Sequence, residues 1–132
     1  MCIDFTSEIE TTQTNEICYK VVTEWNGEFC SCYSPNHRDI QPQFETPGKE
    51  FHYKLGKTSK SSLKNSPGIY AFRNLSDAAI MAASVWPKPR ILKAKINKGT
   101  KYRLGRTCWA YSFEPNCICV EKLTPIEICK PE

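Results

Sequence analysis

The sequence has no apolar run approaching the roughly eighteen residues that a membrane-spanning helix needs. Its first residues lack the basic segment and apolar core of a secretory signal, so we expect a cytosolic protein without a membrane partner. Walker-type loops and the patterns G-x-G-x-x-G, H-E-x-x-H and G-x-S-x-G are absent. These absences exclude the commonest signatures of nucleotide-binding and hydrolytic enzymes. With only His37 and His52 present, a histidine-activated thiol nucleophile is also disfavoured.

Acidic residues are scarce in the middle of the chain. Residues 49–106 contain fourteen lysines and arginines but only Glu50 and Asp77 as acids, so this segment carries +12 and the rest of the chain −8. A segregated basic surface raises the local concentration of anions. Phosphate-bearing ligands and nucleic acid are therefore the expected partners. For any single lysine, a solvated surface position explains the composition equally well.

The chain has 132 residues, and we expect residues 1–132 to form one domain with a core of its own. Its eight cysteines would suit four disulfides in a secreted protein, but in the reducing compartment expected here they stay free. Two C-x-C pairs, Cys30 with Cys32 and Cys117 with Cys119, would each point two thiols to one face of a strand. Zinc prefers longer spacings, so we rank a zinc site below plain core packing.

Alternating β-branched and aromatic residues predict many short strands. The strongest patterns cover residues 17–25, 28–33, 51–55, 69–73, 90–96, 101–104, 117–123 and 126–129. Residues 2–5 suggest an edge strand, and residues 107–113 also alternate. A turn is expected at Gly105 and a break at Thr124-Pro125. The expected class is α+β: a mostly antiparallel sheet of about seven or eight short strands with one main helix on one face.

A β-hairpin is expected around Asn26-Gly27, because that dipeptide permits the positive φ angles of a type I′ turn. A two-residue loop pairs Thr23 with Cys30 and Val21 with Cys32. Three segments lack strand or helix periodicity. They are an acidic, extended lead-in at 1–16 apart from the edge strand at 2–5, a long loop at 34–50 and a basic, serine-rich loop at 57–67.

The main helix is expected at about residues 76–86, directly after the strand at 69–73. Asn74 or Ser76 provides its N-cap. The segment is rich in alanine and poor in polar residues, so we expect a largely buried helix that two following prolines end.

The central segment resembles the core of the ADP-ribosyltransferase fold. The resemblance lies in Gly68-Ile-Tyr-Ala-Phe72, the helix start Ser76-Asp-Ala-Ala79, the return strand 91–96 and Lys98-Gly99. It covers about a quarter of the chain, and it implies that this segment lies beside bound NAD.

In that family the tyrosine of the run stacks on nicotinamide, which would be the role of Tyr70. The catalytic glutamate, which polarises the ribose 2′-hydroxyl, corresponds to Glu114, although Pro115 is not its usual neighbour. The family histidine is followed by glycine and a small hydroxyl residue, and neither His37 nor His52 fits that pattern. These departures predict binding without efficient group transfer.

A second resemblance is to small uncharacterised proteins of bacteriophages and large DNA viruses. It rests on the order of Tyr53-Lys-Leu-Gly-Lys57, Gly68 to Phe72 and Lys98-Gly-Thr-Lys-Tyr102. It implies a viral or mobile-element context and no particular activity.

Three functions stay open. The favoured one is binding of a phosphate-bearing small molecule or nucleotide, with sequestration as its role in a viral setting. Its expected ligand-binding residues are Lys57, Gly68, Tyr70, Arg73, Arg103 and Arg106. The second is a mono-ADP-ribosyltransferase with NAD as cofactor and Glu114 as catalytic residue. The third is a nucleic-acid or protein interaction module that uses the basic face.

Overall fold

The computed structural model describes residues 3–25, 27–31, 52–61, 67–85, 88–110 and 113–129, except for the side chain of residue 25. The loop predicted at 34–50 and part of the basic loop, 62–66, lie outside these ranges. Cys32 and Asn26 lie outside them as well.

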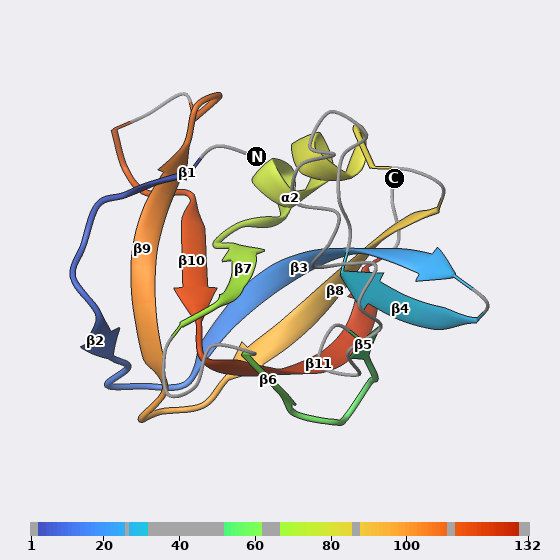
Figure 1. The fold of residues 1–132 in the computed structure, drawn as a ribbon, viewed down its shortest axis with the longest axis horizontal. Coiled ribbons are helices and arrows are strands. Elements are labelled where there is room, and N and C mark those ends of the chain that lie inside the picture. The colour runs from blue at the N-terminus through green and yellow to red at the C-terminus, as the bar shows by residue number, and fades with distance from the viewer. Residues whose placement is uncertain are drawn as a thin grey trace.

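The described residues form eleven strands and one helix (Figure 1). The strands are β1 (Ile3–Phe5), β2 (Glu10–Thr11), β3 (Glu16–Trp25), β4 (Glu28–Ser31), β5 (His52–Tyr53), β6 (Ser59–Lys60), β7 (Ile69–Phe72), β8 (Pro89–Ile96), β9 (Lys101–Thr107), β10 (Cys117–Val120) and β11 (Lys122–Cys129). Eight of them follow one hydrogen-bonded path, β1-β9-β10-β7-β3-β8-β11-β6, and every pairing recorded among the described strands is antiparallel. The α+β class with a mostly antiparallel sheet is confirmed.

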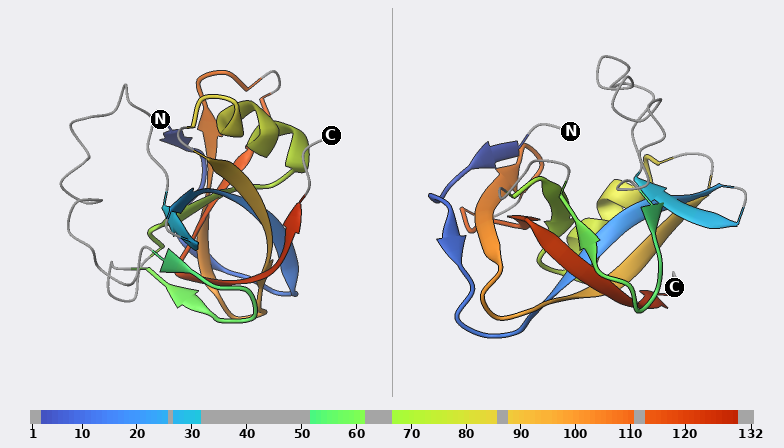
Figure 2. Two further views of the ribbon diagram at one scale, coloured as in Figure 1. Left: turned by 90° about the vertical axis from the view of Figure 1, so that its right-hand side faces the viewer. Right: turned by 60° about the horizontal axis from the view of Figure 1, so that its bottom comes forward.

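The sheet bends into a half-barrel (Figures 1 and 2). The consecutive strands β10 and β11 belong to different halves of it. β10 pairs with β7 and β9, whereas β11 pairs with β8 and β6. Only Glu121 separates β10 from β11. Between the halves, β3 meets β7 at a single register pair, Tyr19 with Phe72. The two halves therefore splay apart at this point.

The predicted hairpin is confirmed in the described residues. β3 pairs with β4 with Thr23 opposite Cys30 and Trp25 opposite Glu28. Gly27 has φ 77°, the left-handed conformation that the turn requires. The expected pair of Val21 with Cys32 lies outside the described residues.

The expected turn at Gly105 is wrong, because β9 runs straight through it. Ile3 and Phe5 of β1 lie over this glycine, and a Cβ built on it would come within 2.6 Å of Ile3 Cγ2. Glycine is thus needed for close approach of a neighbouring strand. The strand pattern expected at 107–113 is wrong for residues 108–110, since β9 ends at Thr107 and the Ala110 N–H donates to the Thr107 carbonyl at 3.2 Å. Residues 111 and 112 lie outside the described ranges.

The expected break at Thr124-Pro125 is also absent. β11 continues across it with a register shift between Pro125 and Glu127. A bulge tolerates proline because it lifts one residue out of the hydrogen-bonded pairing. The Pro125 carbonyl accepts a hydrogen bond from the Gly56 N–H at 2.7 Å.

The helix α2 (Leu75–Ala82) begins close to the expected position but ends about one turn early. Asn74 is its N-cap, as one of the two expected choices. The prediction of a largely buried helix is wrong: Ala78 and Met81 are buried, while Leu75 and Ile80 are 44% and 43% exposed. α2 therefore covers the sheet with one face and leaves the other open to solvent.

Two hydrophobic clusters hold the fold together. The larger one lies inside the half-barrel and is centred on Leu92, Ile96, Val120 and Leu123. The smaller one lies between α2 and the strands β3, β7 and β8, and it includes Met81, Phe72 and Val21. Within the part of the chain that is described, no helix has the length and apolar character to cross a membrane.

Candidate functional site

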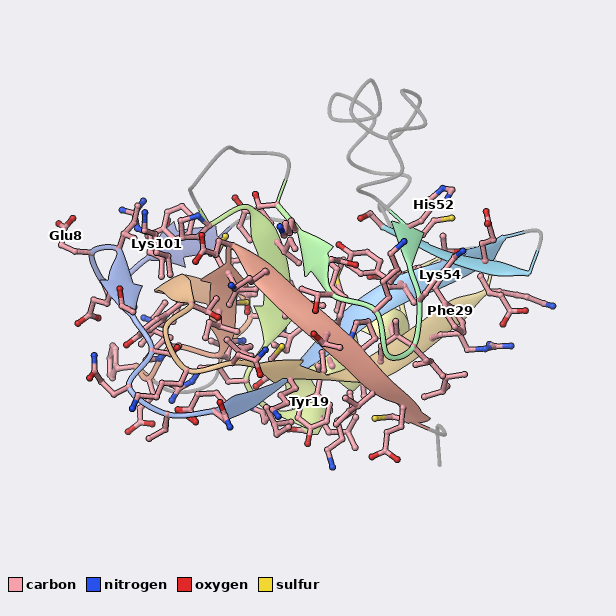
Figure 3. All side chains as sticks on the ribbon, turned by 90° about the horizontal axis from the view of Figure 1, so that it is seen from below. Glu8, Tyr19, Phe29, His52, Lys54 and Lys101 are labelled. Atoms are coloured by element: carbon pink, nitrogen blue, oxygen red, sulfur yellow. The ribbon has the colours of Figure 1, made fainter. Side chains whose placement is uncertain are left out.

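The predicted ligand-binding residues do not converge on one place. Lys57 follows Lys54, and its backbone N–H donates to the Lys54 carbonyl at 3.1 Å. Lys54 lies at the hairpin end of the molecule, and Lys101 of β9 lies at the opposite end (Figure 3). Lys57 is therefore remote from Arg103, which belongs to the same strand as Lys101.

Arg73 and the predicted catalytic Glu114 meet in a cavity beside the start of α2. This α2 cleft has a volume of about 530 Å³, which is within the usual range for small-ligand sites. Its polar lining consists of Arg73, Asn74, Ser76, Asp77, Glu114 and Asn116. Ile80, Ala110 and Pro115 complete the wall.

The helix start that borders the α2 cleft is fixed by its cap. Asn74 Oδ1 accepts the Asp77 backbone N–H at 2.9 Å and the Ser76 hydroxyl at 2.8 Å. Asp77 is the acidic residue of the first turn, where it suits the helix dipole. Cap and dipole together hold two polar side chains at the rim of the cleft.

A buried pair of hydrogen bonds anchors the other wall of the α2 cleft. Asn116 Nδ2 donates to the Thr107 hydroxyl at 2.8 Å, and the Thr107 N–H donates to Asn116 Oδ1 at 3.0 Å. Arg73 binds the same loop twice, through its N–H to the Asn116 carbonyl and through Nη1 to the Pro115 carbonyl, both at 2.9 Å. The loop carrying Glu114 is thus tied to the ends of β7 and β9.

Tyr70 of β7 lies outside the α2 cleft, on a sheet face to which Phe5 of β1 also contributes. Its ring stacks on Phe5 with centroids 6.4 Å apart and planes at 21°. The Arg103 guanidinium lies over the Phe5 ring, 4.1 Å from its centroid. We call Arg103, Phe5 and Tyr70 the ring stack. The sequence pointed to Tyr70 and Arg103 but not to Phe5.

Cross-strand register explains why the ring stack forms. Cys119 of β10 lies opposite both Tyr70 of β7 and Arg103 of β9, so the three side chains share one sheet face. Phe5 shares this face because it lies opposite Gly105, two residues after Arg103 in β9. Arg103 Nε also donates to the Ser7 carbonyl at 2.9 Å, which ties the chain after β1 to β9.

Positive charge surrounds Tyr70. Lys20 Nζ donates to the Tyr70 carbonyl at 2.7 Å, where β3 and β7 splay apart. Burial raises the pKa of the Tyr70 hydroxyl, Cys119 adds to the rise, and Lys20 and Arg103 oppose it. No carboxylate contributes to this shift.

The two remaining predicted ligand-binding residues, Arg106 and Gly68, make contacts within the fold. Arg106 lies opposite Asp4 of β1, and its guanidinium is 5.4 Å from the centroid of the Phe113 ring. Gly68 donates its N–H to the Val120 carbonyl at 3.1 Å. Neither residue lines the α2 cleft, and neither is part of the ring stack.

The charge segregation seen in the sequence is partly undone by the fold. The acidic lead-in carries β1 and β2, and both strands pair with the basic strand β9. Elsewhere Arg90 and Lys88 pair with Glu24 at 3.3 and 4.0 Å, and Lys93 pairs with Glu127 at 3.3 Å. The basic segment is therefore not one continuous positive surface.

Three of the six described cysteines, Cys18, Cys117 and Cys119, are buried core residues. Burial raises the pKa of Cys117 from its ordinary value of 9.0 to about 12 and that of Cys119 to about 11. Cys30 is partly buried in β4, and the six described cysteines are free thiols. In the described ranges no group of three or more side chains is placed to hold a metal, and Cys32 lies outside them.

Comparison of the chain with protein-family models, with curated proteins and with solved structures finds no match in any of the three. The resemblances noted in the sequence therefore rest on their quoted residues alone.

Proposed function

We propose that the protein binds a nucleotide, or a closely related phosphate-bearing small molecule, in the α2 cleft. The observation that carries this proposal is the meeting of Arg73 and Glu114 in a cavity of about 530 Å³. Arginine is the residue best suited to a phosphate, because its guanidinium donates several hydrogen bonds in one plane. A cavity of this volume accommodates a mononucleotide.

The charges of the lining favour a nucleotide over a bare anion. Among the described residues of the lining, Arg73 is the single cationic side chain, and Asp77 and Glu114 are two carboxylates facing the same space. Two carboxylates repel free phosphate but accept hydrogen bonds from sugar hydroxyls or base amino groups. A ligand with one anionic end and several hydrogen-bond donors at its other end can bind Arg73 and the two carboxylates at once.

A mono-ADP-ribosyltransferase using NAD stays a prediction. That reaction requires the stacking tyrosine and the glutamate in one site, whereas Glu114 lines the α2 cleft and Tyr70 lies in the ring stack. Likeness to the ADP-ribosyltransferase fold, a viral context, sequestration of the ligand and a cytosolic location are parts of the same proposal.

Isothermal titration calorimetry with nucleoside monophosphates tests the proposal, with unphosphorylated nucleosides and inorganic phosphate titrated in parallel. We expect the mononucleotide to bind more tightly than either fragment. Arg73→Gln should weaken mononucleotide binding roughly tenfold or more, because a charge-assisted hydrogen bond is lost. Glu114→Gln should weaken it less and should reduce the preference over phosphate.

The matched control is Arg90→Gln, since Arg90 is an arginine whose partner Glu24 lies outside the α2 cleft. It should leave binding unchanged. Absence of heat with every nucleotide at millimolar concentration would overturn the proposal. Equal affinity of wild type and Arg73→Gln would do the same.

A further inference from the structure

We infer that the ring stack is a binding surface for single-stranded nucleic acid, separate from the α2 cleft. The occupant would place an unpaired base on the exposed side of the Tyr70 and Phe5 rings and its phosphates near Arg103. This inference goes beyond the proposed small-ligand site and uses none of that site's residues.

The first step is the exposure of the rings. Phe5 is 40% exposed and Tyr70 is 41% exposed, although both are large aromatic side chains on a sheet face. They already stack on one another, so their planes are nearly aligned. A pre-aligned aromatic surface costs little ordering entropy when a further planar ring is added to it.

The second step is the charge around the rings. Arg103 uses Nε on the Ser7 carbonyl and holds its guanidinium over Phe5. Lys20 binds the Tyr70 carbonyl and lies 5.6 Å from the centroid of the Tyr53 ring. Among the described residues, neither cation has an acidic side chain within ion-pair distance, unlike Arg90 and Lys93. Their charge is therefore available to phosphate.

The third step is the direction of approach. Asp4 of β1 lies opposite Arg106 and Glu10 of β2 lies opposite Tyr102, both along the outer edge of β9. Tyr102 neighbours Arg103 in the strand, so its side chain points to the other face. Glu10 is one of the groups that raise the pKa of Tyr102, and no carboxylate contributes to the pKa shift of Tyr70. A polyanion therefore meets less repulsion on the sheet face that carries Tyr70 and Arg103 than on the face that carries Tyr102.

These three features favour a single strand over a duplex or a free anion. Unpaired bases offer their faces to aromatic side chains, and this stacking tolerates any sequence. In a duplex the base faces are covered, so only the phosphates would remain for Arg103 and Lys20. A phosphate ion alone would make no use of the rings.

Fluorescence anisotropy with a labelled single strand of about ten nucleotides tests the inference. We expect saturable binding at about 50 mM salt that weakens by about 200 mM, with a log–log slope near −1.4 if two phosphates are contacted. Tyr70→Ala should weaken binding roughly tenfold, because one stacked base loses its ring. Tyr70→Phe should keep the wild-type affinity.

Phe113→Ala is the matched control, because Phe113 is a 92% exposed aromatic that also lies beside an arginine but outside the ring stack. It should leave binding unchanged. A duplex of the same sequence should bind more weakly than the single strand. Equal affinity of the wild-type protein and the Tyr70→Ala variant, with circular dichroism showing that both are folded, would overturn the inference. So would a flat salt response or the absence of any binding at low salt.

The two proposals fail separately. Arg73→Gln should weaken mononucleotide binding and leave the single strand bound, and Tyr70→Ala should do the reverse. Loss of single-strand binding in Arg73→Gln would show that no independent ring-stack site exists.

Discussion

The α2 cleft and the ring stack lie on the same half of the sheet but are assembled in different ways. The cleft is made mostly by neighbours in sequence: Arg73 to Asp77 form one wall and Glu114 to Asn116 another. The ring stack joins Phe5, Tyr70 and Arg103, which come from three separate strands. A site of the first kind depends on a cap and a loop, whereas one of the second kind depends on the register of the whole sheet.

The largest expected effect concerns β10, which both regions share. Cys117 packs under α2 and Cys119 lies between Arg103 and Tyr70. Their folded pKa values of about 12 and about 11 exceed the ordinary 9.0, as does that of buried Cys18 at about 12. The unfolded thiols ionise first, so stability is intact below pH 9 and falls as the pH rises towards 11 to 12.

Urea unfolding at pH 8 and pH 10 measures this loss. At pH 10 we expect each of the three thiols to lower the free energy of unfolding by roughly 1 kcal/mol. Ligand binding at the α2 cleft and at the ring stack should weaken together. Cys117→Ala should show a smaller pH-dependent loss than wild type. Parallel pH profiles for the two proteins would contradict the assignment to buried thiols.

The next effect should separate the regions. Asn116→Ala removes both hydrogen bonds to Thr107 and leaves a buried N–H without its acceptor. We expect a loss of about 2–3 kcal/mol in urea unfolding. Mononucleotide binding should fall because the cleft wall is released, and single-strand binding should persist.

The matched control for that change is Asn15→Ala. Asn15 also accepts a backbone N–H, from Lys98 at 2.8 Å, but it does so in an exposed position. Its loss should be clearly smaller. Equal losses for the two variants would show that burial of the Asn116 pair is not what matters.

A change at Gly105 should act on the ring stack instead. Gly105→Ala places a Cβ within 2.6 Å of Ile3 Cγ2, so β1 must shift and take Phe5 with it. We expect about 1–3 kcal/mol of destabilisation from overpacking, weaker single-strand binding and unchanged mononucleotide binding. Ile3→Ala in the same background should recover part of the stability, which a double-mutant cycle measures. Strictly additive effects would count against the contact.

The smallest effect is expected at the N-cap of α2. Asn74→Ala leaves the Asp77 N–H without its acceptor and should cost about 1 kcal/mol in thermal unfolding. It should also weaken mononucleotide binding modestly, since Ser76 and Asp77 border the cleft. Asn74→Asp retains a capping oxygen and should restore stability. A variant Asn74→Ala as stable as wild type would show that the cap is dispensable.

Local features were predictable from the sequence. The hairpin at Gly27 and the N-cap at Asn74 depend on conformational preferences within a few residues, so local pattern was sufficient. The helix end was not predicted, because α2 stops at Ala82 before the prolines that the pattern relied on. Its exposed Ile80 shows that apolar composition alone does not establish burial.

Long-range features were not predictable in the same way. The sequence predicts a turn at Gly105, because nothing near this glycine in sequence reveals that Ile3 packs against it. Phe5 was missed for the same reason, since its partners lie in β7 and β9. The meeting of Arg73 with Glu114 likewise depends on the pairing of β7 with β10, which local periodicity does not encode.

The nearly continuous run of β10 and β11 has a consequence for how the chain folds during synthesis. These strands come after all other described elements, yet each half of the sheet needs one of them as a neighbour. Until they leave the ribosome, β7, β8 and β9 have open edges, and such edges invite pairing with other chains. Folding of the half-barrel should therefore be completed only after β11 has left the ribosome, and slowly, because its pairings are distant in sequence.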